Sequence, residues 1–172
     1  MSGDGRSQFD PASVVIKPAA TVMLVREAES RGIEVFMMKR TTKAAFAGGM
    51  YVFPGGAVDA EDSSYEIAAI RECFEEAGVL LARNGSGATV RFDDPISADR
   101  FTRHRHDVHE GRRSMTSVLR DEQLTAAVDE LHWVSHWVTP YGEVRRFDTR
   151  FFVAAMPQDQ DPLHDDKELV DR

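Results

Sequence analysis

Residues 51–81 read "YVFPGGAVDAEDSSYEIAAIRECFEEAGVLL", and this stretch decides the fold. Three glutamates, Glu72, Glu75 and Glu76, fall within five consecutive residues of it. On a helix, like charges three or four residues apart repel each other by roughly a few tenths of a kcal/mol per pair. Only Arg71 can pair with this cluster at helical spacing, and its partner would be Glu75. The clustering of the three glutamates therefore requires a reason.

The spacing of apolar residues predicts a helix over Ser64–Ala77. Ser63 is a good N-cap, and Glu66 three residues later completes a capping-box pattern, with Asp62 as the competing cap. Gly78 is well placed to end the helix. The apolar face of this helix consists of Ile67, Ile70, Cys73, Phe74 and Ala77. The three glutamates point away from that face and lie near the C-terminal end, where the helix dipole disfavours negative charge.

Two interpretations of the acidic face remain open. It is either a solvated helix surface or a site for a hard cation. Residues 54–56, Pro-Gly-Gly, predict a turn before the helix, where bare backbone carbonyls can come close to another group. Carboxylate and carbonyl oxygens on a rigid element suit Mg²⁺ or Mn²⁺, which would relieve the repulsion.

The rest of the chain indicates strands around one dominant helix, with more helices later, in an α/β or α+β layered domain. The expected elements are a tail at residues 1–13, a hairpin of strands Ala19–Val25 and Ile33–Arg40, a short strand Met50–Phe53, two or three helical pieces within residues 97–131 with breaks near Gly111 and Asp121, and a central strand Arg145–Met156. Residues 14–172 would form the single domain.

Composition excludes several classes of function. The 172 residues carry 29 acidic and 21 basic side chains, a net charge of -8. This balance argues against nucleic-acid or membrane-surface partners, which need a positive field. The single cysteine, Cys73, excludes an internal disulfide and a cysteine-rich metal site. We find no apolar run of membrane-spanning length and no signal-peptide core, so the expected location is cytoplasmic.

The stretch "GGAVDAEDSSYEIAAIRECFEEAGV" resembles the Nudix box, G-x5-E-x7-R-E-U-x-E-E-x-G-U, where U is a bulky apolar residue. The positions that match in register are Arg71, Glu72, Cys73, Glu75, Glu76, Gly78 and Val79. Gly56 matches in type, but one extra residue separates it from Arg71. Either Glu61 or Asp62 therefore replaces the first glutamate of the box. With "YVFPGG", "WVTP" and "RRFDTRFF", the chain is similar to the branch of coenzyme A diphosphatases and their peroxisomal relatives.

The resemblance implies an α/β/α sandwich with a mixed sheet. It also implies an enzyme that hydrolyses the pyrophosphate of a nucleoside diphosphate linked to another group. Glu72, Glu75 and Glu76 would be the metal ligands, together with a carbonyl of Gly55 or Gly56. Arg71 would orient a box glutamate. The general base would be Glu168, or one of Glu75 and Glu76.

Cations for the substrate phosphates are expected at Arg40, Arg145 and Arg146. The basic stretch at residues 103–113, "RHRHDVHEGRR", is either a contact for an extra phosphate or a solvated helix face. Its histidines do not favour a zinc site, because His104 and His106 diverge on a helix. Trp133 and Trp137 are either core residues or a surface that stacks on a base, with core the expectation for such large side chains.

The chain departs from the family pattern in two places. The segment before the box, "TTKAAFAGGMYVFPGG", lacks the "LRxHxGQ" motif of coenzyme A diphosphatases. That leaves coenzyme A, acyl-coenzyme A, ADP-ribose and NADH-like substrates open. After Glu168 the resemblance predicts a Trp-containing strand and a closing helix, but the sequence stops at "ELVDR". Three alternatives are open: the C-terminal part is truncated, the fold finishes differently, or a partner subunit covers the gap. An open sheet edge there would favour a homodimer. The alternative function is an inactive Nudix-fold module for nucleotide binding or regulation.

Overall fold

The computed structural model describes residues 10–28, 32–40, 49–160, 162 and 169–171. The strands are β1 (Ile16–Glu27), β2 (Ile33–Val35), β3 (Met38–Arg40), β4 (Tyr51–Val52), β5 (Gly55–Ala57), β6 (Ala82–Arg83), β7 (Thr125–Ala126), β8 (His132–Val138), β9 (Arg146–Ala155) and β10 (Leu169–Asp171). The helices are α1 (Tyr65–Ala77), α2 (Pro95–His109), α3 (Met115–Asp121) and the 3-10 turns η1 (Pro11–Ser13) and η2 (Val128–Glu130). Most of the predicted tail, residues 1–9, lies outside this description.

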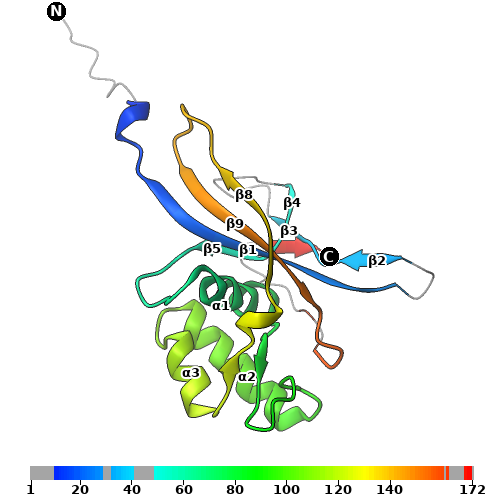
Figure 1. The fold of residues 1–172 in the computed structure, drawn as a ribbon. Coiled ribbons are helices and arrows are strands. Elements are labelled where there is room, and N and C mark those ends of the chain that lie inside the picture. The colour runs from blue at the N-terminus through cyan, green and yellow to red at the C-terminus, as the bar shows by residue number, and fades with distance from the viewer. Residues whose placement is uncertain (1–9, 29–31, 41–48, 161, 163–168, 172) are drawn as a thin grey trace, which may run out of the picture.

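The main sheet is mixed, with the order β2-β1-β9-β8 and with β5 also paired to β1. β1 and β9 run parallel over ten residue pairs, from Ile16–Arg146 to Val25–Ala155. The other pairings within this sheet are antiparallel. β9 lies between β1 and β8, which confirms the prediction of a central strand. Figure 1 shows the three α-helices on one side of this sheet, and the α/β class is confirmed.

The core forms where α1 lies against β1 and β9. Four residues of the predicted apolar face of α1, Ile70, Cys73, Phe74 and Ala77, are buried, and the fifth, Ile67, is partly buried. The four buried residues pack in one cluster with Val22, Leu24 and Phe152 from the sheet. Burying each large apolar side chain contributes about 1.5–3 kcal/mol. This contribution holds α1 in place even though its opposite side carries the acidic cluster.

The start of α1 differs from the prediction by one residue. Ser64, not Ser63, is the N-cap, and its hydroxyl accepts a hydrogen bond from the Ile67 N–H at 3.3 Å. The capping-box pattern of Ser63 and Glu66 is therefore wrong, because Glu66 is one position too early to reach back to the cap. Gly78 ends the helix as predicted, with a left-handed φ of 70° that favours glycine.

The predicted strand Ile33–Arg40 is in fact two strands. β2 pairs with β1, and the Phe36 N–H still donates to the Leu24 carbonyl at 2.9 Å. If the pairing continued for two more residues, Met38 would lie opposite Val22 and would have to bond it. The Val22 N–H already donates to the Pro54 carbonyl at 3.0 Å. The chain therefore leaves this edge, and β3 forms a separate small sheet with β4 and β10.

The prediction of a turn at Pro-Gly-Gly, residues 54–56, is wrong, because these residues lead into a strand. Gly55–Ala57 forms β5, with Gly55 opposite Thr21 and Gly56 opposite Ala20. A Cβ atom on Gly55 would lie 2.4 Å from the Thr21 Oγ1 and 2.5 Å from the Ala20 carbonyl oxygen. Only glycine permits this close approach of two backbones.

We predict that Gly55→Ala lowers the free energy of unfolding by about 1–3 kcal/mol, because the new methyl group must displace backbone atoms of β1. Gly85→Ala is the matched control, since nothing lies within 4 Å of a Cβ built at Gly85. Urea unfolding followed by circular dichroism measures both variants. Equal stabilities of the two would contradict the close packing of β5 on β1.

Candidate active site

The acidic cluster lies where the second half of α1 faces β5. Gly56 makes room for Glu72: a Cβ atom at position 56 would lie 2.5 Å from the Glu72 Oε1. One residue earlier, the Gly55 N–H donates a hydrogen bond to the Glu76 Oε2 at 2.8 Å. The two glycines therefore bring the strand into direct contact with two of the three glutamates.

Arg71 is the centre of the site. Its guanidinium Nη1 donates to Glu72 and to Glu75, at 2.9 Å each. Its Nη2 donates to Asp62 at 2.9 Å and to the Ala57 carbonyl at 2.8 Å. Burial would by itself lower the pKa of Arg71, but its hydrogen bonds and the charges of the carboxylates raise the pKa well above its ordinary range. The guanidinium is therefore permanently charged and acts on the glutamates rather than on solvent.

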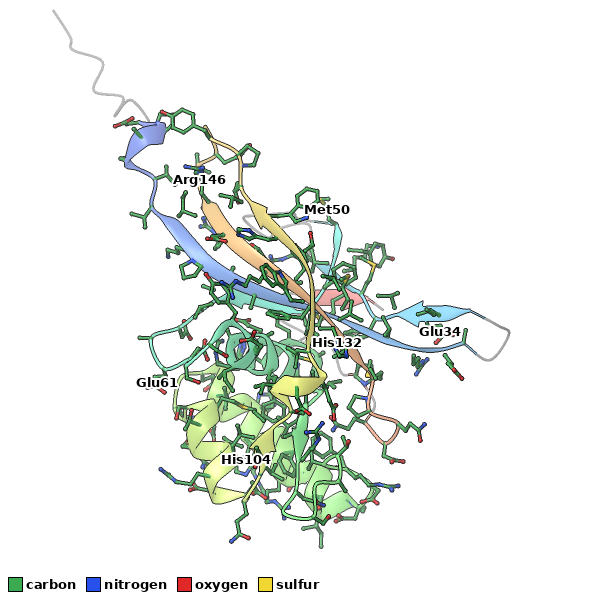
Figure 2. The ribbon with its side chains drawn as sticks, viewed as in Figure 1. Glu34, Met50, Glu61, His104, His132 and Arg146 are labelled. Carbon is green, nitrogen blue, oxygen red and sulfur yellow. The ribbon has the colours of Figure 1, made fainter. Side chains whose placement is uncertain are left out.

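Asp62 takes the place of the first box glutamate. Its side chain is 3% exposed, and it accepts hydrogen bonds from both Nε and Nη2 of Arg71. Asp62 also accepts the Asp59 N–H at 2.8 Å, which folds the loop around the arginine. Glu61 is exposed on that loop (Figure 2). The choice between Glu61 and Asp62, which spacing leaves open, is resolved by this bidentate ion pair.

The site holds more negative charge than Arg71 can balance. Burial raises the pKa of Glu72 to about 7; Arg71 opposes this shift and the charge of Glu75 adds to it. Four carboxylates, those of Asp59, Asp62, Glu72 and Glu75, lie within 3.7 Å of the one guanidinium. A bound cation would supply the missing positive charge.

The backbone distinguishes between the two glycine carbonyls. The Val22 N–H bonds the Pro54 carbonyl, and the Val58 N–H bonds the Pro18 carbonyl. Because hydrogen-bonded pairs alternate along an antiparallel ladder, Gly56 faces β1 and Gly55 faces away from it. The Gly55 N–H confirms this direction, since it bonds Glu76 on α1. Gly55 is therefore the glycine whose carbonyl is directed toward the acidic cluster.

The residues fit a hard divalent cation in type. Glu72, Glu75, Glu76 and the Gly55 carbonyl offer only oxygen donors, which Mg²⁺ and Mn²⁺ prefer. Among the described residues, no three His, Cys, Asp or Glu side chains converge on one point. Instead, Glu72 and Glu75 turn to Arg71, and Glu76 turns to the Gly55 N–H. A cation would have to draw these carboxylates from their present partners.

Arg105 of α2 is a further part of the site that sequence reasoning missed. Its buried guanidinium donates to the main-chain carbonyls of Glu75 at 2.8 Å and Glu76 at 3.0 Å. The last carbonyls of a helix have no partner within the helix. The spacing in the sequence could have indicated this role, because Arg105 lies at helical spacing from the apolar residues Phe101 and Val108 and shares the buried side of α2 with them. His109 of the same helix places its Nδ1 3.8 Å from the Glu75 Oε2.

The other arginines of the basic stretch at residues 103–113, and His104, pair with acidic residues of the same chain. Arg103 pairs with Asp99, His104 with Glu122, and Arg113 with Asp121. Arg112 pairs with both Asp107 and Glu110. These contacts favour a structural role for the stretch over a site for an extra phosphate.

The three candidate phosphate arginines lie on other elements. Arg40 ends β3 in the small sheet, and its N–H donates to the Met50 carbonyl. Arg145 is exposed in the loop between β8 and β9. Arg146 donates to the Thr139 carbonyl and lies at the end of β9 away from the helices (Figure 2). Their contact with substrate stays a prediction.

Two other predictions have clear outcomes in the structure. Trp133 and Trp137 are 60% and 68% exposed, so the expectation that they belong to the core is wrong. Both lie on β8, and the Arg150 guanidinium lies over the Trp133 ring at 5.3 Å from its centroid. Glu168, the candidate general base, lies outside the described residues.

Comparison with known proteins identifies the architecture. A NUDIX hydrolase from Alicyclobacillus acidocaldarius has a solved structure with a TM-score of 0.77 and 29% identity, covering 91% of this chain and 77% of that one. The match in fold makes this a Nudix-type domain. The chain belongs to the Nudix hydrolase family, since the family described as NUDT19 Nudix domain matches residues 61–172.

Two curated relatives refine the comparison. The putative nudix hydrolase 7 of Caenorhabditis elegans is 33% identical over 155 residues, which are 87% of this chain and 47% of that protein. The human acyl-coenzyme A diphosphatase NUDT19 is 32% identical over 115 residues, which are 62% of this chain and 30% of that protein. The chain thus spans about half or less of these relatives. In the described part of the chain, no helix has the length and apolar character needed to cross a membrane.

The raised pKa of Glu72 predicts a pH dependence of stability in the metal-free protein. Between pH 4.5, the ordinary pKa, and about 7, the folded state keeps a proton that the unfolded state releases. Stability from Glu72 is therefore present below this window and is lost as the pH rises through it. The free energy of unfolding of wild type should therefore fall by roughly 2–3 kcal/mol from Glu72 between pH 5 and pH 8, and in Glu72→Gln this fall should be absent.

Urea unfolding in the presence of a chelator, at both pH values, measures this difference. Glu66→Gln, in the first turn of the same helix, is the control and should keep the wild-type pH dependence. A Glu72→Gln variant whose stability changes with pH as in wild type would show that Glu72 is ionised throughout.

Proposed function

We propose that this chain hydrolyses the pyrophosphate bond of a nucleoside diphosphate linked to another group, with Mg²⁺ or Mn²⁺. The observation that carries this proposal is the shortage of positive charge around Arg71, next to an oxygen-only donor set. The family supports it, because relatives that match the chain are named nudix hydrolase and acyl-coenzyme A diphosphatase.

In this proposal the ligands are Glu72, Glu75, Glu76 and the Gly55 carbonyl. When bound, the cation activates water and stabilises the charge that develops on the phosphate oxygens. Arg71 holds Glu72 and Glu75 at fixed positions, and Arg105 holds the backbone that carries Glu75 and Glu76. The protein thus keeps the segment that carries these carboxylates in place before the substrate arrives, and the side chains exchange their present partners for the cation.

Acyl-coenzyme A or coenzyme A is the substrate class we favour, because a human relative is named acyl-coenzyme A diphosphatase NUDT19 and the matched family model is the NUDT19 Nudix domain. ADP-ribose and NADH-like compounds are the other candidates. Glu168 as general base, and Arg40, Arg145 and Arg146 as phosphate contacts, remain part of the proposal. The net charge of -8 supports the absence of nucleic-acid and membrane-surface partners, and a cytoplasmic location remains part of the proposal.

The test is a screen of coenzyme A, acyl-coenzyme A, ADP-ribose, NADH and dinucleoside polyphosphates with Mg²⁺ and Mn²⁺, with products identified by mass. Wild type should hydrolyse at least one compound at the pyrophosphate. Glu75→Gln should lose about 10²-fold or more of that rate, because a ligand charge is removed without a change in shape. Glu66→Gln should keep it.

Two outcomes would contradict the proposal. Wild type that is inert on every compound, yet binds one of them in calorimetry, would indicate the alternative function, an inactive nucleotide-binding module. A Glu75→Gln variant with full activity would remove the acidic cluster from the mechanism.

A further inference from the structure

Among the described strands, β8 lies at the edge of the main sheet. It ends the main sheet, where β9 is its one neighbour among the described strands. Six of its seven residues are exposed, including Trp133, Val134, Trp137 and Val138. An edge strand with free backbone groups and exposed apolar side chains is a template for pairing with another strand.

The hydrogen-bond ladder shows which backbone groups face outward. Thr139 pairs with Phe147, and its N–H donates to the Phe147 carbonyl at 2.9 Å. Bonded pairs alternate along an antiparallel ladder, so Trp137 also faces β9, while His136 and Val138 direct their N–H and C=O groups away from it. A bulge between Trp133 and Ser135 interrupts the ladder before this point.

The same segment lacks the usual protection against pairing. Edge strands are commonly blocked by charged residues or proline. Residues 132–138, "HWVSHWV", contain no Asp, Glu, Lys, Arg or Pro, although the whole chain carries a net charge of -8. Two copies of so acidic a protein repel each other over most of their surface. They would not repel where the edges of β8 meet.

From this edge we propose that two copies of the chain associate by antiparallel pairing of β8 with β8 of the second copy, about a two-fold axis at Trp137. In this register His136 of each copy pairs with Val138 of the other copy. Both residues already direct their backbone groups outward, so each of the two facing pairs forms both ladder bonds. A two-fold interface uses the same patch on both copies, as this register does.

Trp137 then lies directly opposite Trp137 of the second copy. It occupies a non-hydrogen-bonded position, where opposing side chains come closest and aromatic pairs stabilise a sheet. The Trp137 indole is 68% exposed, and its Nε1 donates to the Ser135 Oγ at 2.7 Å. This bond fixes the ring before association. A contact of one short strand is small, so the expected dimer is weak and concentration-dependent.

Sedimentation equilibrium on the full chain tests the association. Wild type should show a reversible monomer–dimer equilibrium at concentrations up to about 0.5 mM. Trp137→Lys brings two positive charges face to face and should weaken association at least about tenfold. Ile96→Lys is the matched control, since Ile96 is 75% exposed on α2 and the charge change is the same. Circular dichroism should show both variants folded.

Cysteine cross-linking tests the register. Opposing residues in a non-hydrogen-bonded pair have Cα atoms about 4.5 Å apart, within the range of a disulfide. Under mild oxidation, Trp137→Cys should form a disulfide-linked dimer, whereas Ile96→Cys should not. Cys73 is buried and should not react. A wild type that stays monomeric at all concentrations, or equal cross-linking of the two variants, would overturn the proposal.

Discussion

The buried guanidinium of Arg71 is the interaction on which the site depends. A buried cation is stable only when it is paired and hydrogen-bonded, and clustered carboxylates need a cation in turn. Arg71 meets both conditions by contacting a loop through Asp62, a strand through the Ala57 carbonyl, and its own helix through Glu72 and Glu75. One side chain thus holds together the three segments that form the acidic site.

Arg105 gives the site a second support, from a different helix. It bonds main-chain carbonyls rather than carboxylates, so it holds the end of α1 without consuming negative charge. The side chains of Glu75 and Glu76 are engaged instead by Arg71 and by the Gly55 N–H. The β8 edge lies beyond β9 and β1 from the glycine strand β5, so self-association there would leave the acidic site uncovered.

Much of this could be predicted from the sequence, and the exceptions have physical reasons. The apolar face of α1, its end at Gly78 and the central strand β9 follow from periodicity and glycine chemistry. β5 could not be predicted, because it forms only by pairing with β1, in which Thr21, the partner of Gly55, lies 34 residues earlier in the sequence. The split after Val35 likewise depends on Pro54 having already bonded Val22. Arg105 reads as one basic residue among several until α2 is placed against α1.

The parallel pairing of β1 with β9 also sets the order in which the chain can fold. Ile16 pairs with Arg146, a sequence separation of 130 residues. Contacts this distant require a large loss of chain entropy before they form, and they slow folding. During synthesis α1 emerges long before β9. Until β9 is made, the apolar face of α1 can pack only against the earlier strands of the sheet. That interval is when this domain would be most exposed to aggregation, and most in need of a chaperone.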